Sequence, residues 1–183
     1  MKKILKLTMI LFLISAIVAG VLGVVYELTV DRINEIAAQK TADAYAEVLS
    51  AKDYKEVQYT GDDTAIDKIS QAIAEDGSAS GYVVETTVTG SQGSITIIIG
   101  VDNDYKCTGI SIISHSETSG LGAKAADTGE FGTNWRAKFV GEGDDIAITK
   151  KGGNIDAITA ATITSNAVTG AVSTSIKAVE SLG

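Results

Sequence analysis

The sequence predicts an α+β protein in which a single N-terminal transmembrane helix precedes a domain built on an antiparallel sheet. Three observations support this class. An uncharged apolar run lies near the N-terminus, β-branched segments separated by short turns occupy the middle, and the last segment has helical periodicity. The chain has 183 residues, which is enough for one compact domain and an anchor.

The first element is the apolar run from Leu7 to Tyr26, which contains 20 consecutive uncharged residues. As a helix it would be about 30 Å long, the thickness of a bilayer's hydrocarbon core. The alternative is a cleaved signal peptide, whose apolar region is typically about 7–15 residues long and ends at a small-residue cleavage site. This run is longer and no clear site ends it, so we expect residues 1–26 to form a cytoplasmic N-terminus and a retained membrane anchor.

Charges on the two sides of this run predict its orientation. Lys2, Lys3 and Lys6 precede it, whereas Glu27 and Asp31 follow it. Positive residues stay on the cytoplasmic side. We therefore expect a single-pass cell-membrane protein whose residues 27–183 are extracytoplasmic.

The second element is a membrane-proximal helix, expected within residues 27–53. Helical periodicity continues from Glu27 to about Ala51, and neither Gly nor Pro separates it from the span. One long helix should therefore leave the membrane. Its apolar stripe, interrupted at Thr41, consists of Val30, Ile33, Ala37, Ala44 and Val48.

Residues 54–183 are expected to form the folded domain, and its first part is predicted as a strand, a helix and a loop. A short strand is expected within Val57–Asp63. The spacing of Ile66, Ile69 and Ile73 predicts an amphipathic helix over Thr64–Glu75. The small polar residues 76–81 predict a loop.

The next part predicts three strands in an antiparallel meander, over Tyr82–Val88, Ser94–Val101 and Thr108–Ile113. Residues 114–155 are Gly-rich and expected to be irregular. The final segment, Thr164–Leu182, repeats apolar residues at steps of three and four and predicts a helix.

Composition excludes several function classes. The chain has 15 basic and 23 acidic residues, and without the three N-terminal lysines the net charge is −11, which argues against nucleic-acid binding. The single cysteine, Cys107, excludes an internal disulfide, a Cys-based zinc site and an iron–sulfur cluster. The single histidine, His115, excludes a multi-histidine site, so no metal site is expected. We expect Cys107 and Trp135 to be buried in the core.

Residues 156–165 form a loop of small residues that leads into the last helix. Free N–H groups and the helix dipole at such a start favour anions, and the Thr162 hydroxyl would lie beside them. The alternative is ordinary helix capping by Ser and Thr.

This segment resembles the flavinylation motif of the FMN-binding domain family, Asp-x-x-(Ser/Thr)-Gly-Ala-(Thr/Ser). It matches at Asp156, Thr159, Ala161 and Thr162, and Ala160 stands where the family has Gly. The resemblance implies that Thr162 is joined to FMN through a phosphoester by a separate flavin transferase that uses FAD. It also implies that the motif and the residues just after it bind the cofactor: Asp156, Thr159, Ala160, Ala161, Thr162, Thr164 and Ser165.

A second segment, His115–Gly122, resembles the family's His-x-Glu-Thr-Pro-Gly-Leu-Gly, with Ser119 in place of Pro. The resemblance implies that this loop lines the flavin site through His115, Glu117, Thr118, Gly120, Leu121 and Gly122. His115 is alternatively an ordinary packed or exposed residue, and Glu117 and Thr118 alternatively shape a turn. Lys150 and Lys151 fit a solvated turn, from which one lysine can face the phosphate.

With its one span, the chain resembles G subunits of Rnf complexes and, second, C subunits of sodium-pumping NADH:quinone oxidoreductases. This implies an electron-carrying subunit of a ferredoxin:NAD⁺ oxidoreductase, a translocase that drives Na⁺ or H⁺ movement. The implied partners are other membrane and redox subunits, the flavin transferase and membrane lipid. One uncharged helix offers no ion path and no dinucleotide fingerprint is present, so pumping and NAD binding belong to partners. Alternatives are a stand-alone anchored flavoprotein and a non-redox scaffold; a Thr-nucleophile hydrolase is remote, because no base is evident near Thr162 in the sequence.

Overall fold

The computed structural model describes residues 2–182, which divide into two units, one up to Lys40 and one from Thr41 onward. In chain order the elements are α1 (Lys2–Val48), β1 (Asp53–Val57), β2 (Ile66–Ile73), β3 (Ala79–Thr89), β4 (Ser94–Val101), β5 (Cys107–His115), η1 (Gly122–Ala126), α2 (Glu130–Ala137), η2 (Thr149–Lys151) and α3 (Thr162–Glu180).

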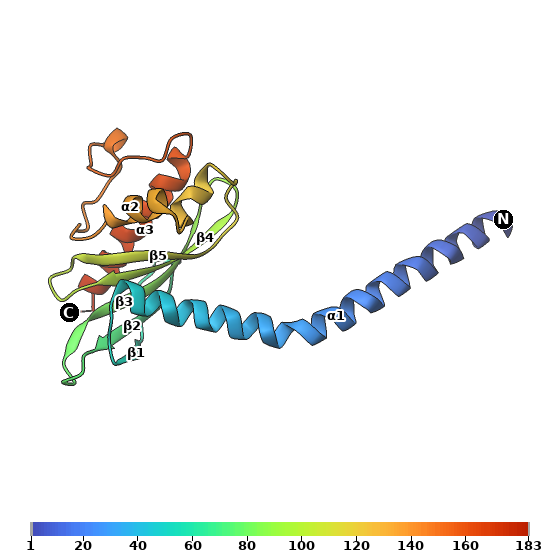
Figure 1. Cartoon of the computed structure of the whole chain (residues 1–183), viewed down its shortest axis with the longest axis horizontal. Coiled ribbons are helices and arrows are strands. Elements are labelled where there is room, and N and C mark those ends of the chain that lie inside the picture. The colour runs from blue at the N-terminus through green and yellow to red at the C-terminus, as the bar shows by residue number, and fades with distance from the viewer. Residues whose placement is uncertain (1, 183) are drawn as a thin grey trace. The chain divides into compact units, whose positions relative to one another are not determined.

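The first unit consists of the greater part of α1, which is continuous from Lys2 to Val48 (Figure 1). By length and composition this helix can cross a membrane, and none of its most apolar window is buried. The prediction of one long helix is confirmed. It ends at Val48 rather than near Ala51, because Ala51 already precedes the first strand.

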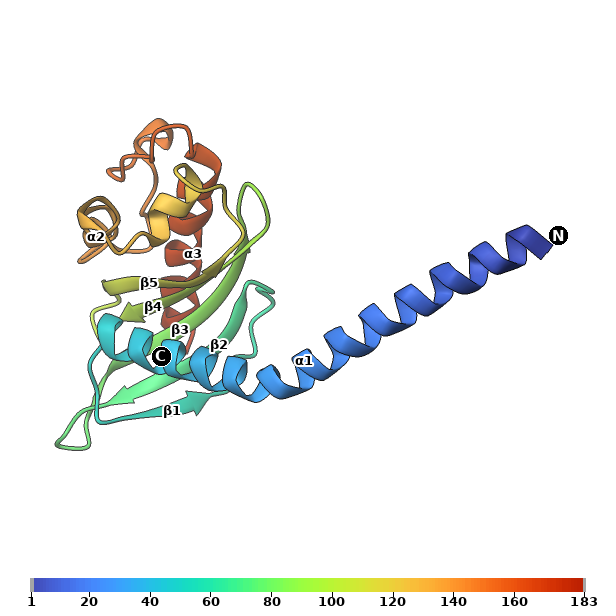
Figure 2. The same cartoon turned by 45° about the vertical axis from the view of Figure 1, so that its right-hand side comes forward.

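The second unit is built on a five-stranded antiparallel sheet in the order β1-β2-β3-β4-β5 (Figure 2). Val84 on β3 lies opposite Ile69 on β2 and Ile99 on β4, and Ile99 lies opposite Ile110 on β5. Short turns join neighbouring strands, which is why the order follows the sequence. The predicted antiparallel meander is confirmed and gains two strands at its start.

The predicted helix over Thr64–Glu75 is wrong, because β2 occupies Ile66–Ile73. The apolar spacing misled the prediction because β2 carries two irregularities, at Ile66/Lys68 and at Ala72/Ile73, which break the strict alternation of a strand. The strand expected within Val57–Asp63 is displaced as well, since β1 ends at Val57.

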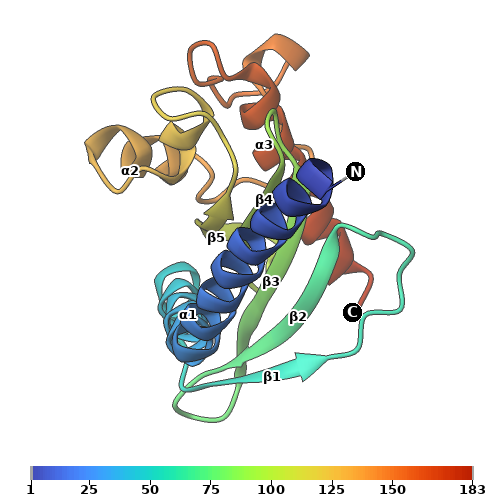
Figure 3. The same cartoon turned by 90° about the vertical axis from the view of Figure 1, so that its right-hand side faces the viewer.

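Helices cover both faces of the sheet in the second unit (Figure 3). On one face, α3 packs against β3 and β4, and the larger core is closed by Trp135 and Phe139, whose ring centroids are 5.0 Å apart. On the other face, the last residues of α1 pack against the sheet through Ala44, Tyr45, Val48, Val83 and Ile98.

Cys107 and Trp135, which the sequence predicted to lie in the core, are both buried. Cys107 is buried among apolar side chains, and burial raises the pKa of its thiol to about 12. Trp135 is also in the core, on α2. The helix α2 corrects the expectation that residues 114–155 are irregular; with eight residues and a glycine in its middle, it is too short to show a clear period.

Candidate functional site

Thr162 is the first residue of α3, and the preceding loop is held without a side-chain cap on the helix. The N-cap residue is Ala161, and no side chain caps it. Instead, Ser165 Oγ accepts a hydrogen bond from the Ile158 amide at 2.9 Å and donates one to the Ala161 carbonyl at 2.9 Å. The alternative of ordinary capping is therefore wrong, and the first amides of α3 remain available to an anion.

A lysine lies beside the Thr162 hydroxyl. Lys150 Nζ, on η2, donates to Thr162 Oγ1 at 3.3 Å. Thr162 itself is partly exposed, and the next residue, Ile163, is 63 % exposed. The hydroxyl is thus reachable from solvent and has a positive charge next to it.

Ala160 has a left-handed backbone, with φ of 60°. Glycine adopts this region freely, whereas an L side chain costs about 1–2 kcal/mol there. The residue is exposed, so its methyl group points to an open surface. The conformation explains why Gly stands at this place in the motif that the segment resembles.

Asp156, the first residue of the motif, is tied to α2. Its carboxylate pairs with Lys138 Nζ at 2.8 Å, and its carbonyl accepts a hydrogen bond from Trp135 Nε1 at 2.8 Å. These two bonds bring α2 next to the motif.

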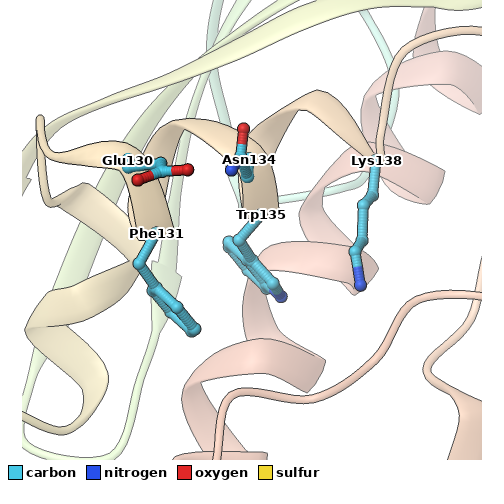
Figure 4. A pocket seen from close by; sticks show the side chains of 5 residues that line it. All are labelled: Glu130, Phe131, Asn134, Trp135 and Lys138. Atoms are coloured by element: carbon cyan, nitrogen blue, oxygen red, sulfur yellow. The ribbon is translucent and has the colours of Figure 1, made fainter.

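A hollow of about 410 Å³ opens along α2 and is lined by Glu130, Phe131, Asn134, Trp135 and Lys138 (Figure 4). Phe131 and Trp135 on α2, and Lys138 directly after it, point toward the same side. Phe131 is 51 % exposed, and Lys124 Nζ lies 5.6 Å from the centre of its ring. The sequence did not predict Phe131, Asn134 and Lys138 as lining residues. The one signal in the sequence was an aromatic residue four residues before the single tryptophan.

The loop His115–Gly122 is organised around Glu117, which is 8 % exposed. Glu117 Oε1 accepts hydrogen bonds from the amides of Ser91 at 2.7 Å and Gln92 at 3.0 Å, and Oε2 accepts one from Thr164 Oγ1 at 2.5 Å. Burial alone would raise the pKa of Glu117. The bonds from Thr164, Gln92 and Ser91, together with His115, outweigh it and hold the pKa below its ordinary value.

The two glycines of this loop serve different needs. Gly120 has a left-handed φ of 76° and open space around it. A Cβ on Gly122 would collide with the Glu117 carboxylate and lie 2.6 Å from Thr164 Oγ1. Gly122 therefore makes room for the contact between Glu117 and Thr164.

The remaining loop residues face solvent. His115, Thr118 and Leu121 are exposed, and the Thr118 carbonyl accepts hydrogen bonds from the amides of Leu121 and Ala123 at 3.1 and 3.2 Å. A second hollow, of about 450 Å³, is lined by His115, Ser119, Gly120, Ala123, Lys124, Ala126, Asp127 and Thr128. Among the motif residues, Thr159 is exposed, whereas Thr164 and Ser165 are buried.

Comparisons with known proteins match both the N-terminal part and the domain of the chain. The model of the FMN-binding domain matches residues 90–177, and that of the RnfG N-terminal region matches residues 1–48. The chain is 33% identical over 181 residues to the G subunit of the ion-translocating oxidoreductase complex of Methanosarcina acetivorans, covering 96% of this chain and 94% of the relative. It is 34% identical over 200 residues to the G subunit of the Na(+)-translocating ferredoxin:NAD(+) oxidoreductase complex of Acetobacterium woodii, covering 99% and 94%.

The fold has a solved counterpart. The crystal structure of the C subunit of the Na(+)-translocating NADH-quinone reductase of Parabacteroides distasonis aligns with a TM-score of 0.53 over 76% of this chain and 80% of that one, at 23% identity, which establishes the shared fold. With similarity to the two relatives along nearly its whole length, the chain belongs to the family of G subunits of ion-translocating oxidoreductase complexes.

Proposed function

We propose that this chain carries electrons as a covalent flavoprotein subunit of an Rnf-type ferredoxin:NAD⁺ oxidoreductase that drives Na⁺ or H⁺ translocation, with FMN attached at Thr162. The observation that carries the proposal is the environment of the Thr162 hydroxyl, which is accessible, begins α3 and has Lys150 Nζ at 3.3 Å.

The residues present fit the phosphate of FMN. Unblocked amides at the start of a helix and its positive dipole end favour an anion by roughly 0.3–1 kcal/mol, and more where the site is partly buried. The ammonium group of Lys150 adds a positive charge 3.3 Å from Thr162 Oγ1. A phosphoester on Thr162 Oγ1 would therefore meet charge of the opposite sign from two separate elements, η2 and α3.

The hollow beside α2 fits an aromatic ring system. Phe131 offers exposed aromatic surface, and Asn134 and Lys138 offer hydrogen-bond donors. Trp135 and Lys138 also hold Asp156 at the start of the motif. When bound, FMN supplies the redox chemistry, because a flavin accepts electrons and passes them on, while the protein attaches and orients it.

Attachment is a group transfer that the resemblance assigns to a flavin transferase. Thr162 Oγ1 forms a bond to the phosphorus of the FMN half of FAD, the bond from that phosphorus to the AMP half breaks, and AMP leaves with the electron pair. The hydroxyl proton passes to a base of the transferase. On this chain, Lys150 would stabilise the negative charge of the phosphate that is transferred to Thr162.

A tethered flavin suits the arrangement of the chain. The long apolar part of α1 would anchor residues 1–26 in the cell membrane, so the cofactor stays near the membrane subunits that are its proposed partners. The charge-free span offers no ion path, which assigns translocation to those partners.

Replacement of Thr162 by Val tests the attachment, because it removes the hydroxyl and keeps the shape. With flavin transferase co-expressed, the wild-type chain should gain the mass of one FMN less one water, and Thr162→Val should gain nothing. The matched control is Thr174→Val, a half-buried threonine further along α3 and outside the motif, which should be loaded as the wild type is.

Peptide mass spectrometry reads the outcome directly. Flavin on Thr159, Thr164 or Ser165 would move the attachment site, and a wild-type chain without covalent flavin would contradict the proposed cofactor linkage.

A further inference from the structure

Glu117 joins three parts of the second unit that are far apart in the sequence. Its own loop follows β5, its Oε1 binds two amides of the turn between β3 and β4, and its Oε2 binds Thr164 on α3. The turn is closed by a hydrogen bond from the Gly90 amide to the Gly93 carbonyl at 2.7 Å. The carboxylate thus links the start of α3 to a turn fixed by the sheet.

The site around Glu117 is shaped for a carboxylate from both sides. A Cβ on Gly90 would collide with Oε1, and a Cβ on Gly122 would collide with Oε2. Thr164 is 1 % exposed, so its hydroxyl has no access to water that could replace the bond. Removing Thr164 would leave Glu117 Oε2 buried without its donor, and removing Glu117 would leave the Thr164 hydroxyl buried without its acceptor. An unpaired buried group costs about 1–3 kcal/mol, and more where it is charged.

Thr164 lies two residues after Thr162 on the same turn of α3. No side chain caps this helix. Two contacts hold its first turn to other elements: the buried bond from Thr164 to Glu117 and the exposed bond from Lys150 to Thr162, whereas Ser165 holds only the adjacent loop. A helix turn moves as a unit, so a displacement of Thr164 would reach the Thr162 hydroxyl.

We infer that Glu117 is a positioning residue for flavin attachment: by binding Thr164 it holds the first turn of α3 so that the Thr162 hydroxyl is presented to the flavin transferase in one orientation. The inference rests on the proposed function. It assigns Glu117 a role through Thr164, in place of the flavin contact that the family resemblance implied. Three hydrogen-bond donors within the protein already occupy the carboxylate, which supports this role.

The test measures the rate of FMN attachment to the purified full-length chain in detergent, with purified flavin transferase and FAD, well below the unfolding temperature of every variant. Glu117→Gln keeps the shape but replaces the acceptor facing Thr164 with a donor. Thr164→Val removes the hydroxyl, and Thr164→Ser keeps it. Misplacement of a reacting group by about 1 Å can cost about a hundredfold in rate. We expect Glu117→Gln and Thr164→Val to be slower by about tenfold to a hundredfold, and Thr164→Ser to react as the wild type does.

The matched control is Thr169→Val, the same substitution on the same helix at a threonine that is 2 % exposed. Thr169 Oγ1 donates only to the carbonyl of Ser165, four residues earlier in its own helix. This variant should lose stability and keep the wild-type attachment rate.

Each outcome decides between the two proposals. Equal slowing of Thr164→Val and Thr169→Val would reduce the role of Glu117 to stability and overturn the inference, as would a wild-type rate in Glu117→Gln. A wild-type chain that accepts no FMN at Thr162 would overturn the proposed function and the inference together.

Discussion

At the scale of single residues, the backbone at Ala160 is the unusual feature of the motif. Its φ of 60° is left-handed, whereas the next residue, Ala161, has an ordinary φ of −130° and is buried. Two neighbouring alanines therefore have φ angles of opposite sign, a difference that the sequence does not reveal.

Ala160→Gly should raise the free energy of unfolding by up to about 1 kcal/mol, because relief of about 1–2 kcal/mol of left-handed strain exceeds the greater freedom of an unfolded glycine, about 0.4–1 kcal/mol. The control Ala161→Gly should lower it, since Ala161 has a negative φ and loses a buried methyl group. Denaturant titration of both variants measures the difference. A loss of stability in both would show that Ala160 is not strained.

At the scale of elements, the end of α1 is fastened to the sheet by Tyr45. Its hydroxyl donates to Glu85 Oε1 at 2.5 Å and lies 3.4 Å from Ser70 Oγ, and its ring packs edge-to-face on Tyr54 at 5.0 Å. Residues 41–48 are therefore part of the domain, although the apolar stripe of this helix continues toward the membrane.

Tyr45→Phe keeps the ring contact and removes the hydroxyl, which leaves the Glu85 carboxylate without this donor. We expect the free energy of unfolding of the domain to fall by about 1.5–3 kcal/mol, as for other hydrogen bonds to charged groups. Tyr26→Phe is the control on the same helix, because Tyr26 is 61 % exposed, and it should leave the unfolding of the domain unchanged. Denaturant titration measures the change. An unfolding midpoint of Tyr45→Phe equal to that of the wild type would mean that the end of α1 is held to the sheet by apolar packing alone.

At the scale of the whole molecule, an apolar helix and an acidic domain share one chain. Lys2, Lys3 and Lys6 carry the only charges before Glu27, and the rest of the chain has a net charge of −11. The three lysines that precede the span favour a cytoplasmic N-terminus and an extracytoplasmic domain.

Protease added to intact spheroplasts should digest residues 27–183 and spare a cytoplasmic protein that serves as the control. The result is read with an antibody against the C-terminal part of the chain. Full protection of the domain in intact spheroplasts, followed by digestion after permeabilisation, would reverse the orientation and place the proposed flavin site inside the cell.

The sequence by itself determined the elements whose signal is local. Three elements belong to this group: the 20-residue uncharged run, the β-branched strands from Tyr82 onward and the periodic last helix. Whether each is a helix or a strand follows from the composition and the periodicity of its own residues. The motif ending at Thr162 was likewise found in the sequence, because residues 156–162 are contiguous.

Only the tertiary structure decided the rest. β2 is a strand because β1 and β3 pair with it on both sides, which overrides a spacing that fits a helix. The pairing of Glu117 with Thr164 joins residues 47 positions apart, and the bonds from Trp135 and Lys138 to Asp156 span 21 and 18 positions. Such contacts depend on how the elements pack against one another, and no local pattern records them.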